Sequence, residues 1–230
     1  LKASIKLMGA ELCSLVNLLS GTEHIWQADP DHWPRSAPIL FPCVGTSKND
    51  TVRIDGDNYQ MPRHGFARDM EFKVLEREEG KVTLALEQSE RTLQKFPFCF
   101  KLSITFRLHQ NNLHQEMTVE NTDSRSIGFQ IGLHPAFAVP FAHGNYSDYK
   151  IEFPKKVTAQ RHLLTPGGTY SGEARPMLNN TNTLGLNKQL FYEDAIVFKN
   201  FELQSVSLLR MESGRGLMLG YHGFNHLGIW

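Results

Sequence analysis

Two histidines lie in local sequences that could support acid–base chemistry. His134 follows residues 127–133, IGFQIGL, in which alternation would place Gly128, Gln130 and Gly132 on the face that continues to His134. Glycine weakens a strand interior, and two glycines on one polar face are typical of a surface that a ligand approaches closely. A strand that merely faces solvent, with loosely specified packing, is the alternative.

The second histidine, His64, lies in the segment Pro62-Arg63-His64-Gly65-Phe66-Ala67-Arg68-Asp69. Gly65 permits a tight backbone, and Arg68 could place a guanidinium group near the imidazole. On the local sequence alone, a surface turn with a solvated histidine is the better interpretation.

Other familiar catalytic motifs are absent or incomplete. Residues 45–49, GTSKN, have Asn49 where a nucleophile elbow needs its second glycine, and neither glycine-rich phosphate-binding motif occurs. His222 and His226 have the spacing of two helical zinc ligands, but Gly223 and strand-like neighbours argue against a helix there. We therefore expect no metal ion and no cofactor.

A polar cleft that combines the two histidines with arginines, a carboxylate and aromatic rings would suit a sugar. Sugars offer hydroxyl groups to polar side chains and C–H faces to aromatic rings. The candidate rings are those of Trp26, Trp33, Phe66 and Phe137. The residues alone thus indicate a polar small-ligand site on a β scaffold.

Alternation of apolar and polar residues is the main evidence for that scaffold. Residues 100–108 alternate strictly, and after a turn at 110–112 the pattern resumes at Leu113, Met117 and Val119, which predicts a long antiparallel hairpin. Two further hairpins and six single strands are expected. They cover 51–55 with 57–60, 72–76 with 82–86, and 1–8, 127–133, 149–153, 195–198, 206–211 and 216–221.

Helical patterns are nearly missing. Residues 89–95 could form one or two turns, and no longer window keeps a period of 3.6 residues. Residues 26–49, 135–147 and 166–185 read as long loops, where binding residues tend to collect on a rigid β scaffold. We predict an all-β fold, a sandwich or barrel, with very little helix.

Composition excludes several classes of partner. The 230 residues are 40% hydrophobic and 21% charged, and 24 Lys plus Arg balance 24 Asp plus Glu, so the basic surplus of a nucleic-acid binder is missing. No apolar run approaches the ~20 residues that span a bilayer. The cysteines, Cys13, Cys43 and Cys99, form no disulfide framework, which favours a cytoplasmic protein.

We expect one domain over residues 1–230, incomplete at both ends, since the chain begins at Leu1 and its first residues already read as a strand.

Taken together, six segments resemble the aldose 1-epimerase (galactose mutarotase-like) family, in particular the subgroup encoded near bacterial lactose-utilisation genes. They occur in the family's order and span most of the chain. The segments are Gly9-Ala-Glu-Leu-Cys-Ser-Leu15, Glu23-His-Ile-Trp26, Trp33-Pro-Arg-Ser-Ala-Pro-Ile-Leu-Phe-Pro-Cys-Val-Gly45, His64-Gly-Phe-Ala-Arg68, Gly132-Leu-His-Pro-Ala-Phe137 and Asp194-Ala-Ile-Val-Phe198. The resemblance implies a large, twisted antiparallel β-sandwich and a role in carbohydrate and galactose metabolism.

The resemblance also implies a reaction and its residues. Family members interconvert the α and β anomers of free aldoses: a base takes the proton of the C1 hydroxyl, an acid protonates the ring oxygen, and the ring opens and recloses. By resemblance His134 is the acid, a role that suits a pKa near neutrality, and His64 is the second catalytic histidine. Arg68 and Asp194 correspond to hydroxyl-binding residues, and Arg35 lines the same pocket.

One family residue has no counterpart in the chain. The family's general base is a glutamate on a strand after a Gly-Ile-Trp motif, and here Gly228-Ile229-Trp230 ends the sequence. We therefore expect the polypeptide to continue past Trp230, and residues 1–230 alone to catalyse the reaction poorly. Two alternatives stay open: a non-catalytic carbohydrate-binding protein of the same fold, and a hexose-6-phosphate 1-epimerase in which Arg35 and Arg68 hold a phosphate.

Overall fold

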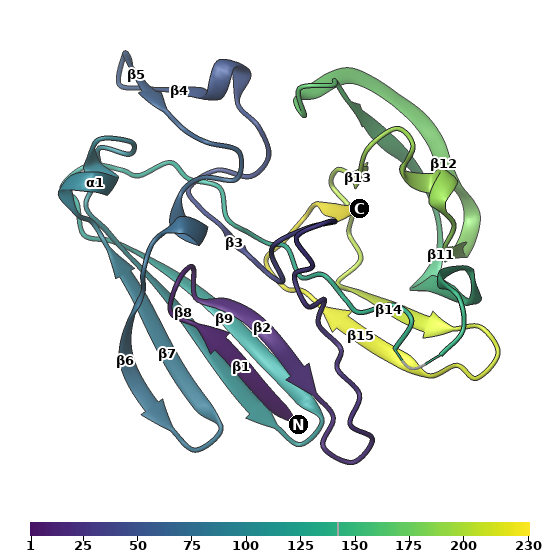
Figure 1. The fold of residues 1–230 in the computed structure, drawn as a ribbon. Coiled ribbons are helices and arrows are strands. Elements are labelled where there is room, and N and C mark those ends of the chain that lie inside the picture. Colours follow the sequence, from purple (N-terminus) through teal and green to yellow (C-terminus); the bar gives the residue numbers. More distant parts are fainter. Residues whose placement is uncertain (142) are drawn as a thin grey trace. The chain divides into compact units, whose positions relative to one another are not determined.

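Strands account for nearly all the regular structure in the computed structural model, which describes residues 1–141 and 143–230 (Figure 1). Within those ranges the only α-helix is α1 (Glu90–Leu93), a single turn capped by Ser89, as the sequence predicts. Short 3₁₀ turns occur at η1 (Lys48–Asp50), η2 (Ala67–Asp69), η3 (Tyr146–Asp148) and η4 (Lys188–Phe191). The strand pairs are antiparallel, so the predicted all-β class is confirmed. In the described part of the chain, no helix has the length and apolar character needed to cross a membrane.

The chain forms two units, residues 1–138 and 139–230. The prediction of one domain over the whole chain stays a prediction. The first unit contains ten strands. These strands are β1 (Lys2–Lys6), β2 (Glu11–Val16), β3 (Ile39–Leu40), β4 (Thr51–Ile54), β5 (Asp57–Gln60), β6 (Lys73–Glu78), β7 (Lys81–Glu87), β8 (Phe100–His109), β9 (Asn112–Asn121) and β10 (Gly132–Leu133).

The predicted hairpins form the body of the first unit. Strands β6, β7, β8 and β9 pair in that order as one sheet (Figure 1). Along β8 the alternation works as expected, because Phe100, Leu102, Ile104 and Phe106 are all at most 2% exposed. They pack with residues of the long irregular segments, so the core of this sheet also anchors the loops.

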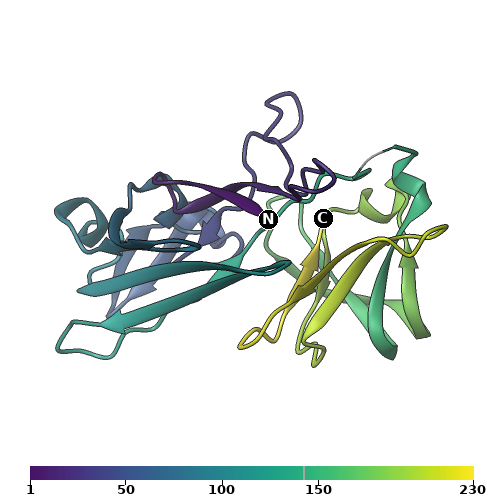
Figure 2. The same cartoon turned by 90° about the horizontal axis from the view of Figure 1, so that it is seen from below.

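The second unit is built on one six-stranded sheet. Its strands are β11 (Tyr149–Leu164), β12 (Tyr170–Gly185), β13 (Ile196–Phe198), β14 (Ser205–Arg210), β15 (Gly216–Gly220) and β16 (Leu227–Ile229). The order is β15-β14-β11-β13-β16, and β12 also pairs with β11. Figure 2 shows the yellow strands β14 and β15 beside the green β11. Phe153, Phe198 and Phe201 meet in its core.

Two predictions of secondary structure are wrong. Residues 166–185, expected as a loop, contain β12, whose pairing with β11 shifts register at four points and therefore hides the period of two. Residues 127–133, expected as one strand, form only the two-residue β10, which pairs with β3. The neighbouring segment cannot extend this ladder, because Pro42 lacks an N–H and Gly45 has a φ of +82°.

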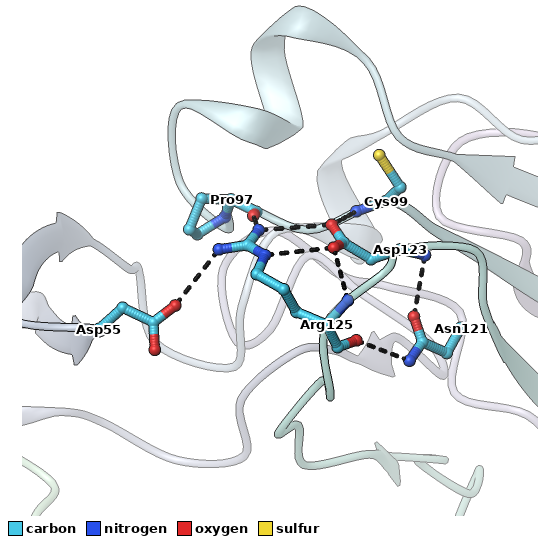
Figure 3. A network of polar contacts seen from close by, with 6 residues as sticks. All are labelled: Asp55, Pro97, Cys99, Asn121, Asp123 and Arg125. Atoms are coloured by element: carbon cyan, nitrogen blue, oxygen red, sulfur yellow. Dashed lines mark hydrogen bonds and ion pairs between the residues drawn. The ribbon is translucent and has the colours of Figure 1, made fainter.

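A polar network fastens the chain after β9 (Figure 3). The Asp123 carboxylate accepts from the Cys99 N–H at 2.9 Å and from the Arg125 side chain at 3.2 Å. Arg125 also donates to the Pro97 carbonyl, contacts Asp55 at 3.2 Å and lies over the Phe98 ring. Three separate segments of the first unit are thus joined, and hydrogen bonding by Arg125 holds the pKa of Asp123 well below its usual range.

Candidate active site

The first unit brings His64 and His134 together. Their ring centroids lie 5.6 Å apart, with the planes at 79°. His64 belongs to the turn between β5 and η2, and His134 directly follows β10. Two imidazoles from distant parts of the sequence therefore border the same space.

Hydrogen bonds on both sides fix the backbone around His134. The β10–β3 pair places Gly132 opposite Leu40. Two residues after the histidine, Ala136 donates its N–H to Ser36 at 2.8 Å and accepts from the Trp26 N–H at 2.9 Å. The histidine is thereby carried on a segment that is paired before and after it.

An unusual backbone turn presents His64. Its φ is +68° and that of Gly65 is +73°, both in the left-handed region. A Cβ atom at position 65 would lie 2.1 Å from the Phe41 carbonyl oxygen, so only glycine fits. That oxygen accepts from the N–H groups of Phe66 and Ala67 at 3.0 and 3.1 Å, which locks the turn against the segment after β3.

The His64 imidazole has a defined hydrogen-bonding direction. Its Nδ1 accepts from the Gly45 N–H at 3.0 Å, so the neutral ring carries its proton on Nε2. Burial, together with the charges of His134, Arg68 and Arg63, lowers the pKa of His64 to about 3. At neutral pH the ring is therefore an uncharged donor through Nε2–H.

His134 lies against an aromatic ring and close to cations. The ring centroids of Trp33 and His134 lie 5.0 Å apart, with the planes tilted by 34°. Burial lowers the pKa of His134 below 6.5; Arg68 and Arg63 act in the same direction, while a backbone hydrogen bond opposes them. The surroundings of His134 thus favour its neutral form.

Arginines and one exposed carboxylate complete the cluster. Arg35 forms an ion pair with Asp69 at 2.6 Å. Arg68 donates to the Arg63 carbonyl at 2.7 Å and has its Nε 3.8 Å from Asp69. The side chains of Arg35 and Arg68 are only 28% and 18% exposed. Burial is the main cause that lowers the pKa of Arg68, and the charges of Arg35 and Arg63 lower it as well. The three guanidinium groups therefore lie near one another.

Sequence reasoning missed two residues of this cluster. Arg63 was named only as part of a motif, although its charge reaches both imidazoles. Glu11 on β2 was not singled out; it is 7% exposed and accepts from the N–H groups of Ser36 and Ala37 at 2.6 and 2.9 Å. The available signal was a glutamate at the start of a mostly apolar segment, residues 11–16, and its carboxylate fixes the backbone next to Arg35.

Asp194 lies in the second unit, and its assignment to the site stays a prediction. It follows η4 with a φ of +66°, and its Oδ1 accepts from the Ala195 N–H at 2.6 Å. The buried Arg161 donates to the carbonyls of Glu193 and Asp194 at 3.2 Å each and so holds this turn. Across residues 1–141 and 143–230, no three His, Cys, Asp or Glu side chains gather in a way that could hold a metal ion.

The first unit thus brings two histidines together close to three arginines on an antiparallel β scaffold. The family model described as Aldose 1-epimerase matches residues 1–214. The chain belongs to the aldose 1-epimerase family.

Individual relatives agree with this assignment. The chain is 31% identical to the chromosomal and plasmid forms of protein LacX of Lactococcus lactis subsp. lactis, over 239 aligned positions that cover 100% of the chain and 80% of LacX. Two solved structures are similar with TM-scores of 0.92. One is a galactose mutarotase related enzyme from Lactobacillus acidophilus, with 30% identity and coverage of 99% and 76%. The other is a galactose mutarotase-like protein from Lactobacillus casei ATCC 334, with 34% identity and coverage of 99% and 79%. The galactose mutarotase-like fold predicted from the sequence is therefore confirmed.

Proposed function

We propose that this protein interconverts the α and β anomers of a hexose by acid–base ring opening and reclosure. The observation that carries the proposal is the pair of imidazoles with ring centroids 5.6 Å apart beside the partly buried Arg68. The uncharged Nε2–H donor of His64 and a second histidine, whose pKa is lowered by burial, can both contact one ring oxygen. The names of the relatives make galactose the first sugar to test.

In the proposed reaction His134 is the acid and His64 its partner. Protonated His134 gives its proton to the ring oxygen, and its lowered pKa makes it a stronger acid once protonated. His64 donates a hydrogen bond from Nε2 to the same oxygen as the C1–O bond breaks. The C1 group then rotates about the C1–C2 bond, and the steps reverse. A general base takes the proton of the C1 hydroxyl, and none of the residues named above has that role.

The remaining site residues bind the sugar in this proposal. Arg68 and Arg35 donate to hydroxyl groups from their partly buried guanidinium groups, and Asp194 accepts from another hydroxyl. Asp69 orients both arginines by its ion pairs at 2.6 and 3.8 Å. Trp33 packs against the His134 ring, with ring centroids 5.0 Å apart, and helps to hold its orientation.

The test is the rate of anomer exchange in the full-length protein. Exchange NMR on equilibrium mixtures, or polarimetry from pure α-galactose and α-glucose, measures that rate directly. His134→Ala should lower kcat by about 10²–10⁴-fold, the usual contribution of a positioned acid. His114→Ala is the matched control, because His114 is exposed on β9. Sugar binding without faster exchange in the wild type would favour the non-catalytic carbohydrate-binding alternative.

A phosphorylated hexose is the second candidate substrate, and the third arginine favours it. Arg35, Arg63 and Arg68 face two carboxylates, Asp69 and the buried Glu11, so positive charge is in excess. Guanidinium groups match phosphate geometry through paired hydrogen bonds.

The two candidates make different predictions for Arg63. If the substrate is a hexose 6-phosphate, Arg63→Ala should lower kcat/KM for the phosphorylated sugar by ~10–100-fold, the worth of one charge-assisted hydrogen bond. The same variant should change kcat/KM for the free sugar by less than about threefold. Equal effects on both substrates would show that Arg63 does not bind a phosphate.

The predicted cytoplasmic location remains a prediction.

A further inference from the structure

Gln130 makes two contacts to the segment that orients His64. Its own N–H donates to the Pro42 carbonyl at 2.9 Å. Its side-chain Oε1 accepts from the Val44 N–H at 2.9 Å. One residue therefore holds both ends of the stretch Pro42–Val44, immediately before Gly45.

Gly132 adds a second constraint on the same segment. It is buried, and a Cβ atom there would lie 3.2 Å from Leu40 Cδ1 and 3.3 Å from Val44 Cγ2. The missing side chain at position 132 is thus space that Leu40 and Val44 fill. The sequence suggested that the polar face of Gln130 and Gly132 receives a ligand; at these two residues the segment 40–44 occupies that face instead.

Gly45 transmits this placement to the imidazole. It accepts from the His64 N–H at 2.8 Å and donates its own N–H to Nδ1 of the same residue at 3.0 Å. The second bond can form only while the Gly45 N–H points at the ring. A shift of the segment by a few tenths of an ångström would weaken it, because hydrogen bonds lose strength steeply with misalignment.

We propose that Gln130 is a positioning residue for His64: through Val44 and Gly45 it fixes the neutral imidazole with its proton on Nε2. The low pKa of His64, about 3, makes this choice of nitrogen meaningful, because the ring carries a single proton at neutral pH. The segment that bears His134 therefore also orients the other histidine. The catalytic consequence rests on the proposed function, whereas the effect on the ring itself does not.

The test is the tautomer of His64, read by long-range ¹H–¹⁵N correlation NMR on protein containing ¹⁵N-labelled histidine. A single tautomer gives widely separated ring-nitrogen resonances, and exchange between tautomers moves them together. His64→Asn identifies the resonances by their loss. In Gln130→Met, which keeps the side-chain length and removes the acceptor, the ratio of Nε2–H to Nδ1–H forms should fall by about 2- to 10-fold, the worth of one net hydrogen bond.

Two further variants separate positioning from a general loss of structure. Gly132→Ala should move the same resonances in the same direction, because its Cβ pushes Val44. Gln115→Met on β9 is the matched control and should leave the His64 resonances unchanged. Melting temperatures of all variants report the fold. Unchanged His64 resonances in folded Gln130→Met would overturn the proposal, as would an equal change in Gln115→Met.

The kinetic readout is evaluated separately. If the protein exchanges anomers, Gln130→Met should lower kcat with little change in KM, since the ring is misdirected and the sugar contacts remain. A wild type without exchange activity would refute the proposed function while the tautomer result still decides the role of Gln130. An active wild type with altered tautomers and an unchanged kcat would refute the catalytic consequence alone.

Discussion

Protonation of His64 should couple the stability of the protein to pH. In the folded chain its pKa lies at about 3, chiefly because the ring is buried, whereas the unfolded value is 6.5. As the pH falls below 6.5, His64 binds a proton in the unfolded chain but stays unprotonated in the folded chain until the pH approaches 3. Stability is therefore full above about pH 7 and is lost as the pH falls towards 3.

The magnitude follows from these two pKa values. Between pH 7 and pH 5 the full shift would remove about 1.9 kcal/mol from the free energy of unfolding. The ring is only partly buried, so solvent screening reduces this, and we expect about 1 kcal/mol. His134 contributes in the same direction, since burial lowers its pKa as well.

Urea unfolding at pH 7, 6 and 5, followed by tryptophan fluorescence, measures the effect. His64→Asn removes the titrating ring, and asparagine tolerates the positive φ at this position. The wild type should lose about 1 kcal/mol more than His64→Asn over this range. His114→Asn, at an exposed position on β9, should behave as the wild type. An identical pH dependence in wild type and His64→Asn would refute the reasoning that this ring is held neutral by burial.

Three substitutions test other parts of the site and scaffold. Gly65→Ala should destabilise the fold by at least ~1–2 kcal/mol in urea unfolding, the cost of left-handed backbone, because its Cβ also meets the Phe41 carbonyl. Glu11→Gln replaces the carboxylate that accepts from the Ser36 and Ala37 N–H groups. It should raise KM for the sugar several-fold, because the backbone next to Arg35 is then held less firmly. An unchanged KM would show that Glu11 has no role in sugar binding. Arg125→Met should lower the melting temperature and leave kcat unchanged, since it only detaches Asp123 and its neighbours.

How far the sequence predicted the fold depended on whether the signal was local. The β8–β9 hairpin was predictable because its inward and outward residues alternate without interruption. The pairing of β11 with β12 was not, because its register shifts place apolar residues at irregular intervals. The strand expected at 127–133 failed for a different reason. Its alternation was real, but Gln130 bonds to the irregular segment at Pro42–Val44 rather than to a regular strand.

For the site, residue types were predictable and their convergence was not. His64 and His134 were distinguished by neighbouring glycines, and only the family resemblance placed them in one cleft. The glycine signal was right at Gly65, where a positive φ and the Phe41 carbonyl exclude a side chain. At Gly132 the same signal had another cause, the packing of Val44. Long-range contacts of this kind leave no periodic trace in the sequence.

The excess of arginine makes a last prediction about the acid. In the ligand-free site Arg63 and Arg68 help keep His134 unprotonated, which works against donation to a ring oxygen. A negatively charged substrate would offset that charge and raise the pKa of His134 in the complex. The pH profile of kcat/KM reports the free protein, and that of kcat reports the complex. With a hexose 6-phosphate, activity should therefore fall with rising pH at a higher midpoint in kcat than in kcat/KM, and the latter midpoint should lie below 6.5. With a free hexose the two midpoints should nearly coincide. Coincident midpoints for the phosphorylated sugar would mean that the arginines do not govern the protonation of His134, and that its acidity is set by burial alone.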